Sequence, residues 1–329
     1  RESGMIPLRD SEWGEHRVIE YLEKLVEDRE YQKALDYAEQ LLLNPENTSR
    51  DLMRIYSLLL PARCETSEFY GAQVAGQLAV KMAEDLQAWD TYGHSTLWLG
   101  VCYDRLGQPE NALAAWYNYL AYVPYYTDSL KHHPTVLYNI GLVSAQAGRP
   151  EEGLQMLKKA TDVAQTYKAE RQAHGIRHAL IDAYLRYGQL EEIPSLLAKC
   201  AHYLRHSPST KTHTQSYLWH LVLRIRYALA TNRTRRAALI AARGLRMTKD
   251  PDLLYHFHML LARTHEKTGA IRLAMGEAVK ARSIVMEARR YDLEYQAANY
   301  MYGLISIHPG LVEQLNNLSS EAWDPPAVD

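Results

Sequence analysis

Hydrophobic residues along this chain recur at helical spacing, in pairs of stripes separated by short polar turns. Over residues 96–124, Leu99-Gly100 and Tyr103 end one apolar stripe, and Ala112 and Trp116 belong to the next. The small Ala112 suits a close helix crossing, and the large Trp116 suits the space between neighbouring pairs. No segment shows the period-two alternation of a half-buried strand bounded by turn residues. The pattern predicts a helical hairpin in an all-α chain.

The hairpin pattern repeats. Successive turn residues lie 41, 40, 44 and 37 positions apart, and they are Gly107, Gly148, Gly188, Asn232 and Gly269. One hairpin cannot bury its apolar face alone, so the copies are expected to stack on one another. We expect hairpins at about 15–43, 49–88, 92–122, 134–166, 171–204, 214–247 and 253–286, and a helix at 291–307 that caps the stack. The second hairpin is expected to be irregular, with helices 49–62 and 67–88 joined around Pro61–Cys64.

These boundaries define three parts of the chain. Residues 1–14 form a polar extension or linker, residues 15–308 the repeat array and residues 309–329 a tail, with a short helix near 311–318. The first residue is Arg1, so either Met5 is the native start or an output domain lies upstream. The sequence leaves both open.

Composition narrows the function classes. The 47% hydrophobic content is enough for a buried helical array, and no apolar run approaches the roughly 18 residues that span a bilayer. The three cysteines, Cys64, Cys102 and Cys200, are far apart and lack metal-binding spacing, which favours a cytoplasmic protein with buried thiols. There is no GxGxxG, P-loop, GxSxG or CxxC motif. We therefore expect no enzyme activity, cofactor, metal or membrane contact.

Charge is unevenly distributed although the net charge is −2. Residues 199–249 contain 11 Lys or Arg and no Asp or Glu. Such a stretch would attract an acidic partner. Alternatively, its cations pair with acids of neighbouring repeats such as Glu191, Glu192, Glu266 and Glu277. Nucleic-acid binding through this stretch is a weaker alternative, because recognised motifs and aromatic platforms are missing.

The residues Leu99-Gly100, Tyr103, Ala112, Trp116 and Pro124 resemble a tetratricopeptide repeat, apart from Thr96 where Trp is usual. The period of about 40 residues and the length of the array are similar to the peptide-sensing domains of bacterial Rap and PlcR-type regulators. This resemblance implies a right-handed superhelix (an α-solenoid) of about seven hairpins plus a capping helix. It also implies a concave groove, lined by the first helix of each hairpin, that binds a protein segment or a short peptide. An adaptor or scaffold role in a protein complex is the alternative, and a homodimer is left open.

Mapping the groove positions of the family onto this sequence gives ten candidate binding residues. They are His94, Trp98, Tyr138, Asn139, His178, Asp182, Arg186, Trp219, Arg226 and Arg263.

Asn139 holds the position at which many peptide-binding members fix the ligand backbone, since an amide both donates and accepts as a peptide unit does. The three arginines of the set could bind an acidic side chain or a free carboxylate end. Each candidate also has a structural alternative: a local hydrogen bond for Asn139, an ion pair for each arginine, and packing between repeats for Trp98 and Trp219.

Overall fold

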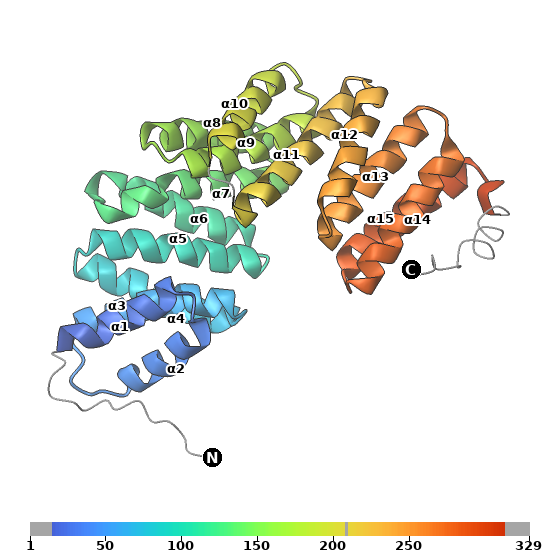
Figure 1. The fold of residues 1–329 in the computed structure, drawn as a ribbon. Helices are drawn as coiled ribbons and strands as arrows, with labels where there is room; N and C mark the ends of the chain where they lie inside the picture. Colours follow the sequence, from blue (N-terminus) through green and yellow to red (C-terminus); the bar gives the residue numbers. More distant parts are fainter. Residues whose placement is uncertain (1–14, 208–209, 313–329) are drawn as a thin grey trace, which may run out of the picture. The chain divides into compact units, whose positions relative to one another are not determined.

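The computed structural model describes residues 15–207 and 210–312, without the side chains of residues 15–17 and 211. This part of the chain contains fifteen α-helices, two 3₁₀ helices and no strand (Figure 1). The all-α prediction is confirmed. The helices are α1 (Glu15–Glu27), α2 (Tyr31–Leu42), α3 (Ser49–Glu65), α4 (Phe69–Asp85), α5 (Trp89–Arg105), α6 (Pro109–Ala121), η1 (Val123–Tyr125), η2 (Asp128–His132), α7 (His133–Gln146), α8 (Pro150–Thr166), α9 (Glu170–Tyr187), α10 (Ile193–His206), α11 (Lys211–Ala230), α12 (Thr234–Met247), α13 (Pro251–Lys267), α14 (Ile271–Glu287) and α15 (Tyr291–Ile307).

The chain forms two compact units, residues 1–176 and 177–329. In the first unit, α1 to α8 form four hairpins, and each helix packs on the one before it. The odd-numbered helices also contact each other, α1 with α3 and α3 with α5. In the second unit, α11 pairs with α12 and α13 with α14, while α15 packs on α14 and α11 contacts α13. With α9 and α10 between these hairpins, the order of the fifteen helices matches the predicted seven pairs and a final helix.

The predicted turn residues adopt the backbone conformation that sharp helix–helix turns require. Gly107, Gly148, Gly188, Asn232 and Gly269 all have positive φ, from 57° to 81°. Glycine and asparagine tolerate this region best, so they identify the turns in the sequence. The turns at Arg29, Ser67, Gln87, Lys168 and Arg289 have the same conformation without glycine. Because none of these five residues is glycine or asparagine, residue type alone did not indicate these turns.

One expectation about the first unit was wrong. Helix α3 does not end at Ala62 but continues through Pro61 to Glu65, and α4 begins at Phe69. Pro61 is buried, and the packing around it outweighs the lost backbone hydrogen bond. Between α6 and α7, where no element was predicted, the chain forms η1 and η2, and η2 contacts both α5 and α7.

The core at α5 and α6 explains the motif that identifies the repeat. Trp116 is 1% exposed and packs directly over Gly100, and its Nε1–H donates to the carbonyl of Leu97 at 3.0 Å. Ala112 is completely buried at the helix crossing, as predicted. The motif residues therefore act in packing, and the burial of large aromatic side chains such as Trp116 accounts for much of the stability of this hairpin.

The cysteines are buried thiols, as expected. Although far apart in sequence, Cys64 and Cys102 belong to one cluster beside α4, where the Cys102 thiol donates to the Phe69 carbonyl at 3.1 Å. Burial, reinforced by the neighbouring Cys102, raises the pKa of the Cys64 thiol to about 12, and burial likewise raises that of Cys200 to about 12. Thiols in such surroundings are poor nucleophiles at neutral pH.

At the carboxyl end, α15 stops at Ile307 as predicted. The expected helix at 311–318 lies largely outside the described residues, as do the extension 1–14 and residues 313–329 of the tail. Among the described helices, none combines the length and the apolar character that a bilayer crossing demands.

Candidate functional site

Three surface pockets are lined mainly by the odd-numbered helices, which are the first helices of the hairpins. Two lie in the first unit and one in the second. This is the face on which the resemblance places the ligand.

The pocket of the second unit has a volume of about 610 Å³ and lies between α9, α11 and α13. Its apolar lining consists of Leu185, Leu229, Ala230 and Leu260, and its polar lining consists of Arg226, Arg263, Glu266 and Lys267. Arg226 and Arg263 lie 37 residues apart, which equals the spacing of the turn residues Asn232 and Gly269. The repeat itself therefore brings the two guanidinium groups to equivalent positions on neighbouring helices.

Charge in this pocket is only partly balanced. The Asp182 carboxylate, on α9, accepts from Arg186 at 2.7 Å and also pairs with Arg226. Glu266 accepts from the Tyr300 hydroxyl at 2.8 Å, and the Lys267 ammonium donates to the Leu229 carbonyl at 2.8 Å. Among the described residues, Arg263 has no acidic partner. The lining thus presents one exposed guanidinium without a counter-ion beside an apolar surface, and such a site suits a carboxylate.

Aromatic groups continue this face along the same helices. The Trp219 and His256 rings meet edge to face, with centroids 5.0 Å apart, and this pair is also separated by 37 residues. Burial lowers the pKa of His256, with Arg226 and Arg263 adding to that effect against the opposing charge of Asp252. On α9, the His178 ring stacks on His220 at 5.8 Å. The half-buried indole of Trp219 and the neutral imidazole of His256 form the less polar end of this face, and Arg226 and Arg263 form its charged end.

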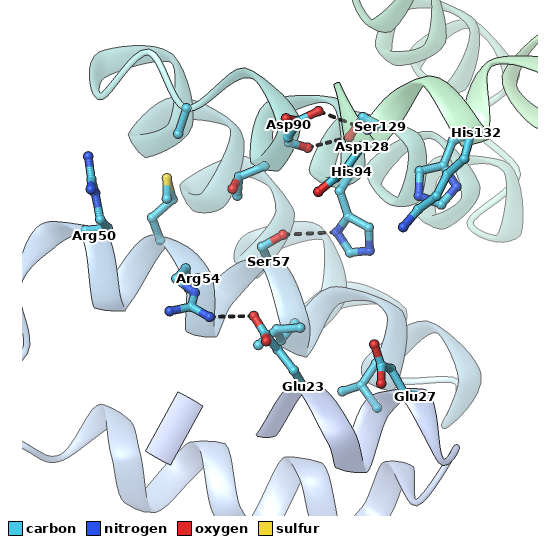
Figure 2. Close-up of a pocket in the computed structure, with 16 residues that line it drawn as sticks. Glu23, Glu27, Arg50, Arg54, Ser57, Asp90, His94, Asp128, Ser129 and His132 are labelled. Atoms are coloured by element: carbon cyan, nitrogen blue, oxygen red, sulfur yellow. Dashed lines mark hydrogen bonds and ion pairs between the residues drawn. The ribbon is translucent and has the colours of Figure 1, made fainter. Parts of the chain in front are cut away.

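The larger pocket of the first unit has a volume of about 570 Å³ and is bounded by α1, α3, α5 and η2. Figure 2 shows Glu23 paired with Arg54 at 2.6 Å on one side and His94 bonded to Ser57 at 3.1 Å on the other. Its other charged or titratable lining residues are Glu27, Arg50, Asp90, Asp128, Lys131 and His132. Of these residues, sequence reasoning had selected only His94.

Asp90 fixes the 3₁₀ segment over this pocket. Its carboxylate accepts from the backbone N–H groups of Thr127 and Ser129, both at 2.9 Å, and from the Thr127 hydroxyl. Burial acts to raise the pKa of Asp90, but these hydrogen bonds outweigh it and hold the pKa below its usual value. One carboxylate on α5 therefore positions Asp128, Lys131 and His132 at the pocket edge.

The two histidines of this pocket are kept neutral. Burial, followed by the charge of His132 and then of Lys131, lowers the pKa of His94 to about 4. The pKa of His132 is lowered to about 4, first by burial and then by Lys131. Their ring centroids are 6.0 Å apart. At neutral pH the pair offers uncharged donors and acceptors to a ligand.

The third pocket, of about 280 Å³, lies between α7 and the start of α9. It is lined by Tyr138, Thr135, Gln172, Gly175 and Ile176, and Gln172 donates to the Thr135 hydroxyl at 3.2 Å. Asn139, half-buried on α7, follows Tyr138 in the chain. Its side-chain amide has no hydrogen-bond partner among the described residues.

Similarity to known proteins is confined to structure. No protein-family model and no curated protein matches this sequence. Among solved structures, the chain is similar to the apo quorum sensor NprR from B. thuringiensis (TM-score 0.63, 10% identity, covering 88% of this chain and 81% of that one). It is also similar to NprR bound to its cognate peptide NprX (TM-score 0.58, 12% identity, 97% and 91%).

A further similar structure is a signal-transduction ATPase with a tetratricopeptide-repeat sensor from Pyrococcus horikoshii (TM-score 0.65, 19% identity). The match covers 85% of this chain and 44% of the ATPase. The chain has a tetratricopeptide-repeat fold.

Within this tetratricopeptide array, the predicted residues other than Asn139 differ in their surroundings. His94, Tyr138, Arg226 and Arg263 line pockets, and Asp182, Arg186 and Trp219 are tied to the second-unit face by ion pairs or ring contacts. His178 lies in a ring stack, while Trp98 packs against the core clusters of α3, α5 and α6. Trp98 thus follows its packing alternative. Whether any of them contacts a ligand stays a prediction.

Several lining residues were missed. Glu23 and Glu27 lie on the first hairpin, and Arg50 and Arg54 on the second, which was expected to be irregular; Lys131 and His132 lie on η2, where no element was predicted. A helical wheel of α3 anchored at Thr48 could have found Arg50 and Arg54, since Thr48 and Asp51 form a capping box that fixes the start of the helix. No feature of the sequence indicates that η2 lines this pocket.

Proposed function

We propose that this protein is a peptide-binding module that captures a short peptide on the faces of its odd-numbered helices and serves as the ligand-sensing part of a regulator. The observation that carries the proposal is the second-unit pocket, where Arg226 and Arg263 flank an apolar lining of leucines. That arrangement suits a peptide that ends in a free carboxylate next to an apolar side chain. The NprR–NprX complex supports it as a case of a similar fold binding a peptide.

Binding energy would be concentrated in a few groups. The carboxylate would form charge-assisted hydrogen bonds with Arg263 and compete with Asp182 for Arg226, while an apolar side chain would cover Leu229 and Leu260. Micromolar affinity, about −8 kcal/mol, is the range expected for such a ligand. Sensing additionally requires two conformations with different affinity for the peptide.

We expect substitutions of the pocket arginines to weaken peptide binding at least about tenfold, because each removes a charged hydrogen bond worth about 1.5–3 kcal/mol. Random short peptides with free carboxyl ends would be selected on the purified protein and identified by mass spectrometry. Fluorescence anisotropy would then compare the Kd of wild type, Arg226→Gln and Arg263→Gln. Carboxyl-terminal amidation of the peptide should produce a similar loss.

The control for this experiment is Arg272→Gln, which removes an exposed arginine of α14 that lines none of the three pockets. It should bind like wild type. If amidated and free peptides bind equally well, or if Arg263→Gln changes nothing, the carboxylate pocket is wrong even if the peptides bind elsewhere.

Asn139 lies in the first unit and is tested separately: we expect Asn139→Ala to weaken, by about three- to tenfold, binding of those selected peptides whose Kd does not depend on Arg226 or Arg263, since the amide would lose one or two hydrogen bonds to a peptide unit. Helicity should not fall, because alanine is the better helix former. Circular dichroism and the same anisotropy titration measure both effects. Asn118→Ala, an exposed asparagine on α6, is the matched control and should leave the Kd unchanged. Equal dissociation constants for the two variants would remove Asn139 from the site.

A further inference from the structure

Helix α12 carries an unusual exposed surface. Leu239 is 73% exposed, and Arg235, Arg236, Arg243 and Arg246 are all exposed around it. These arginines are four and three residues before Leu239 and four and seven after it, so they lie on the same side of the helix within about 60° of the leucine. We call these five residues, together with Arg224 and Tyr217 of α11, the arginine face.

Helix α11 extends this surface across the hairpin. The Arg243 guanidinium lies over the Tyr217 ring, 5.7 Å from its centroid. Arg224 is half-buried, and burial lowers its pKa, with Arg236 and Arg243 adding to that effect against the opposing influence of Tyr217. Three guanidinium groups therefore come close enough to repel one another at the boundary of the two helices.

Acids of neighbouring repeats do not neutralise the arginine face. Among the described residues, none of its arginines forms an ion pair, and in the basic stretch 199–249 the ion pair with an acid is that of Arg226. Of the acids expected to supply pairing, Glu277 is instead bonded to His258 and Lys280, and Glu266 to Tyr300. The pairing alternative from the sequence is therefore wrong for these two acids, and the positive charge remains available.

The arginine face is separate from the pocket that holds Arg226. Arg224 and Arg226 are two residues apart, which places them about 200° apart around α11, on opposite sides of the helix. A role of Arg226 in the pocket therefore does not account for the positive charge of the arginine face on the other side of α11.

We propose that the arginine face is a second docking site, for an acidic amphipathic segment of a partner protein. Asp or Glu side chains of that segment would pair with the four arginines of α12, and an apolar side chain would cover Leu239. The charge complementarity requires an anion. The central leucine favours a protein over a nucleic acid, because a phosphate backbone offers no apolar group to bury it. In addition, Arg243 already covers Tyr217, the aromatic side chain of the arginine face, on which a base could otherwise stack.

The probe for the test is a fluorescein-labelled helical peptide of about 14 residues, four turns, in which Asp and Glu flank two leucines on one side. An analogue with Asn and Gln in place of the acids and a labelled single-stranded oligothymidine are the comparison ligands. We expect the acidic peptide to bind with micromolar Kd, more weakly at high salt. Arg236→Gln/Arg243→Gln should weaken it at least about tenfold, and Leu239→Ser several-fold.

A control variant assigns any loss to this surface. Lys81→Gln/Arg272→Gln removes the same charge from exposed positions of α4 and α14. It should bind the acidic peptide within about twofold of wild type. The proposal is overturned if the acidic peptide does not bind, or if the charge-matched control loses as much as the arginine-face variant. It is also overturned if oligothymidine binds more tightly and Leu239→Ser has no effect, which would mark a nucleic-acid surface instead.

Discussion

Gly100→Ala is expected to destabilise the first unit by about 3–5 kcal/mol, although it adds a single methyl group in a helix. A Cβ at this position would lie 2.2 Å from Nε1 of Trp116 and within 2.6 Å of two further indole atoms. The indole is a rigid, fully enclosed ring, so it cannot yield as a flexible side chain would. Moving it would also break the hydrogen bond to the Leu97 carbonyl and leave a buried donor unpaired.

Urea denaturation of wild type, Gly100→Ala and Gly175→Ala measures the effect. Gly175 is the matched control, because it is also a helical glycine of the first unit but no atom lies within 4 Å of its added Cβ. Gly175→Ala should stabilise by about 0.5–1 kcal/mol, the ordinary gain of alanine over glycine in a helix. Adding Trp116→Phe should reduce the cost of Gly100→Ala by at least about 1 kcal/mol. If the stability losses of Gly100→Ala and Trp116→Phe simply add in the double variant, the Trp116 indole is not what the added methyl group clashes with.

Stability is expected to fall by several kcal/mol between pH 6.5 and pH 4 because of His94 and His132. The folded pKa of each is about 4, while an unfolded histidine titrates near 6.5. In this window the unfolded chain therefore binds more protons than the folded one, and linkage favours unfolding as the pH falls. The stabilisation is fully present above pH 6.5 and is lost by about pH 4. Each shift corresponds to about 3 kcal/mol, reduced to about 2 by partial exposure and the mutual coupling of the pair.

Urea midpoints at several pH values for wild type, His94→Gln/His132→Gln and His202→Gln would check this. Glutamine keeps a donor and an acceptor but does not titrate, so the double variant should lose the extra slope between pH 6.5 and 4. His202, exposed on α10, is the control histidine. Parallel curves for wild type and the double variant would mean that the two histidines do not govern acid sensitivity. Any remaining loss below pH 4.5 would come from carboxylates such as Glu277, whose pKa is lowered to about 2.

The repeat pattern predicted most of the fold, and particular residues show why. A glycine or asparagine at a positive-φ turn is visible in sequence, and so is the pairing of a small residue such as Ala112 with a large one such as Trp116. Both requirements are local: the turn needs a backbone conformation, and the hairpin needs two faces that fit. Pro61 shows the limit of local rules, since the helix around it continues where propensity predicts a break.

The candidate site was predicted less completely, because it depends on contacts between distant residues. Mapping the first helices onto a groove selected Arg226 and Arg263, whose equivalence follows from the repeat length. It could not select His132 or Lys131, which reach the first-unit pocket only because Asp90 holds their segment over α5. Nor could it decide between neutralised and unpaired charge in the basic stretch, which depends on side-chain geometry.

By itself, the sequence determined that this chain is a stack of helical hairpins, and it located the five turns that carry glycine or asparagine. Apolar periodicity and turn chemistry act over a few residues and need no knowledge of distant contacts. The tertiary structure alone decided that η2 forms a wall of the first-unit pocket, that Asp182 pairs with Arg226, and that the arginines around Leu239 have no acidic partners in the described chain. Those outcomes depend on which side chains meet across helices 20 to 50 residues apart, at distances where a shift of an ångström or two makes or breaks an ion pair.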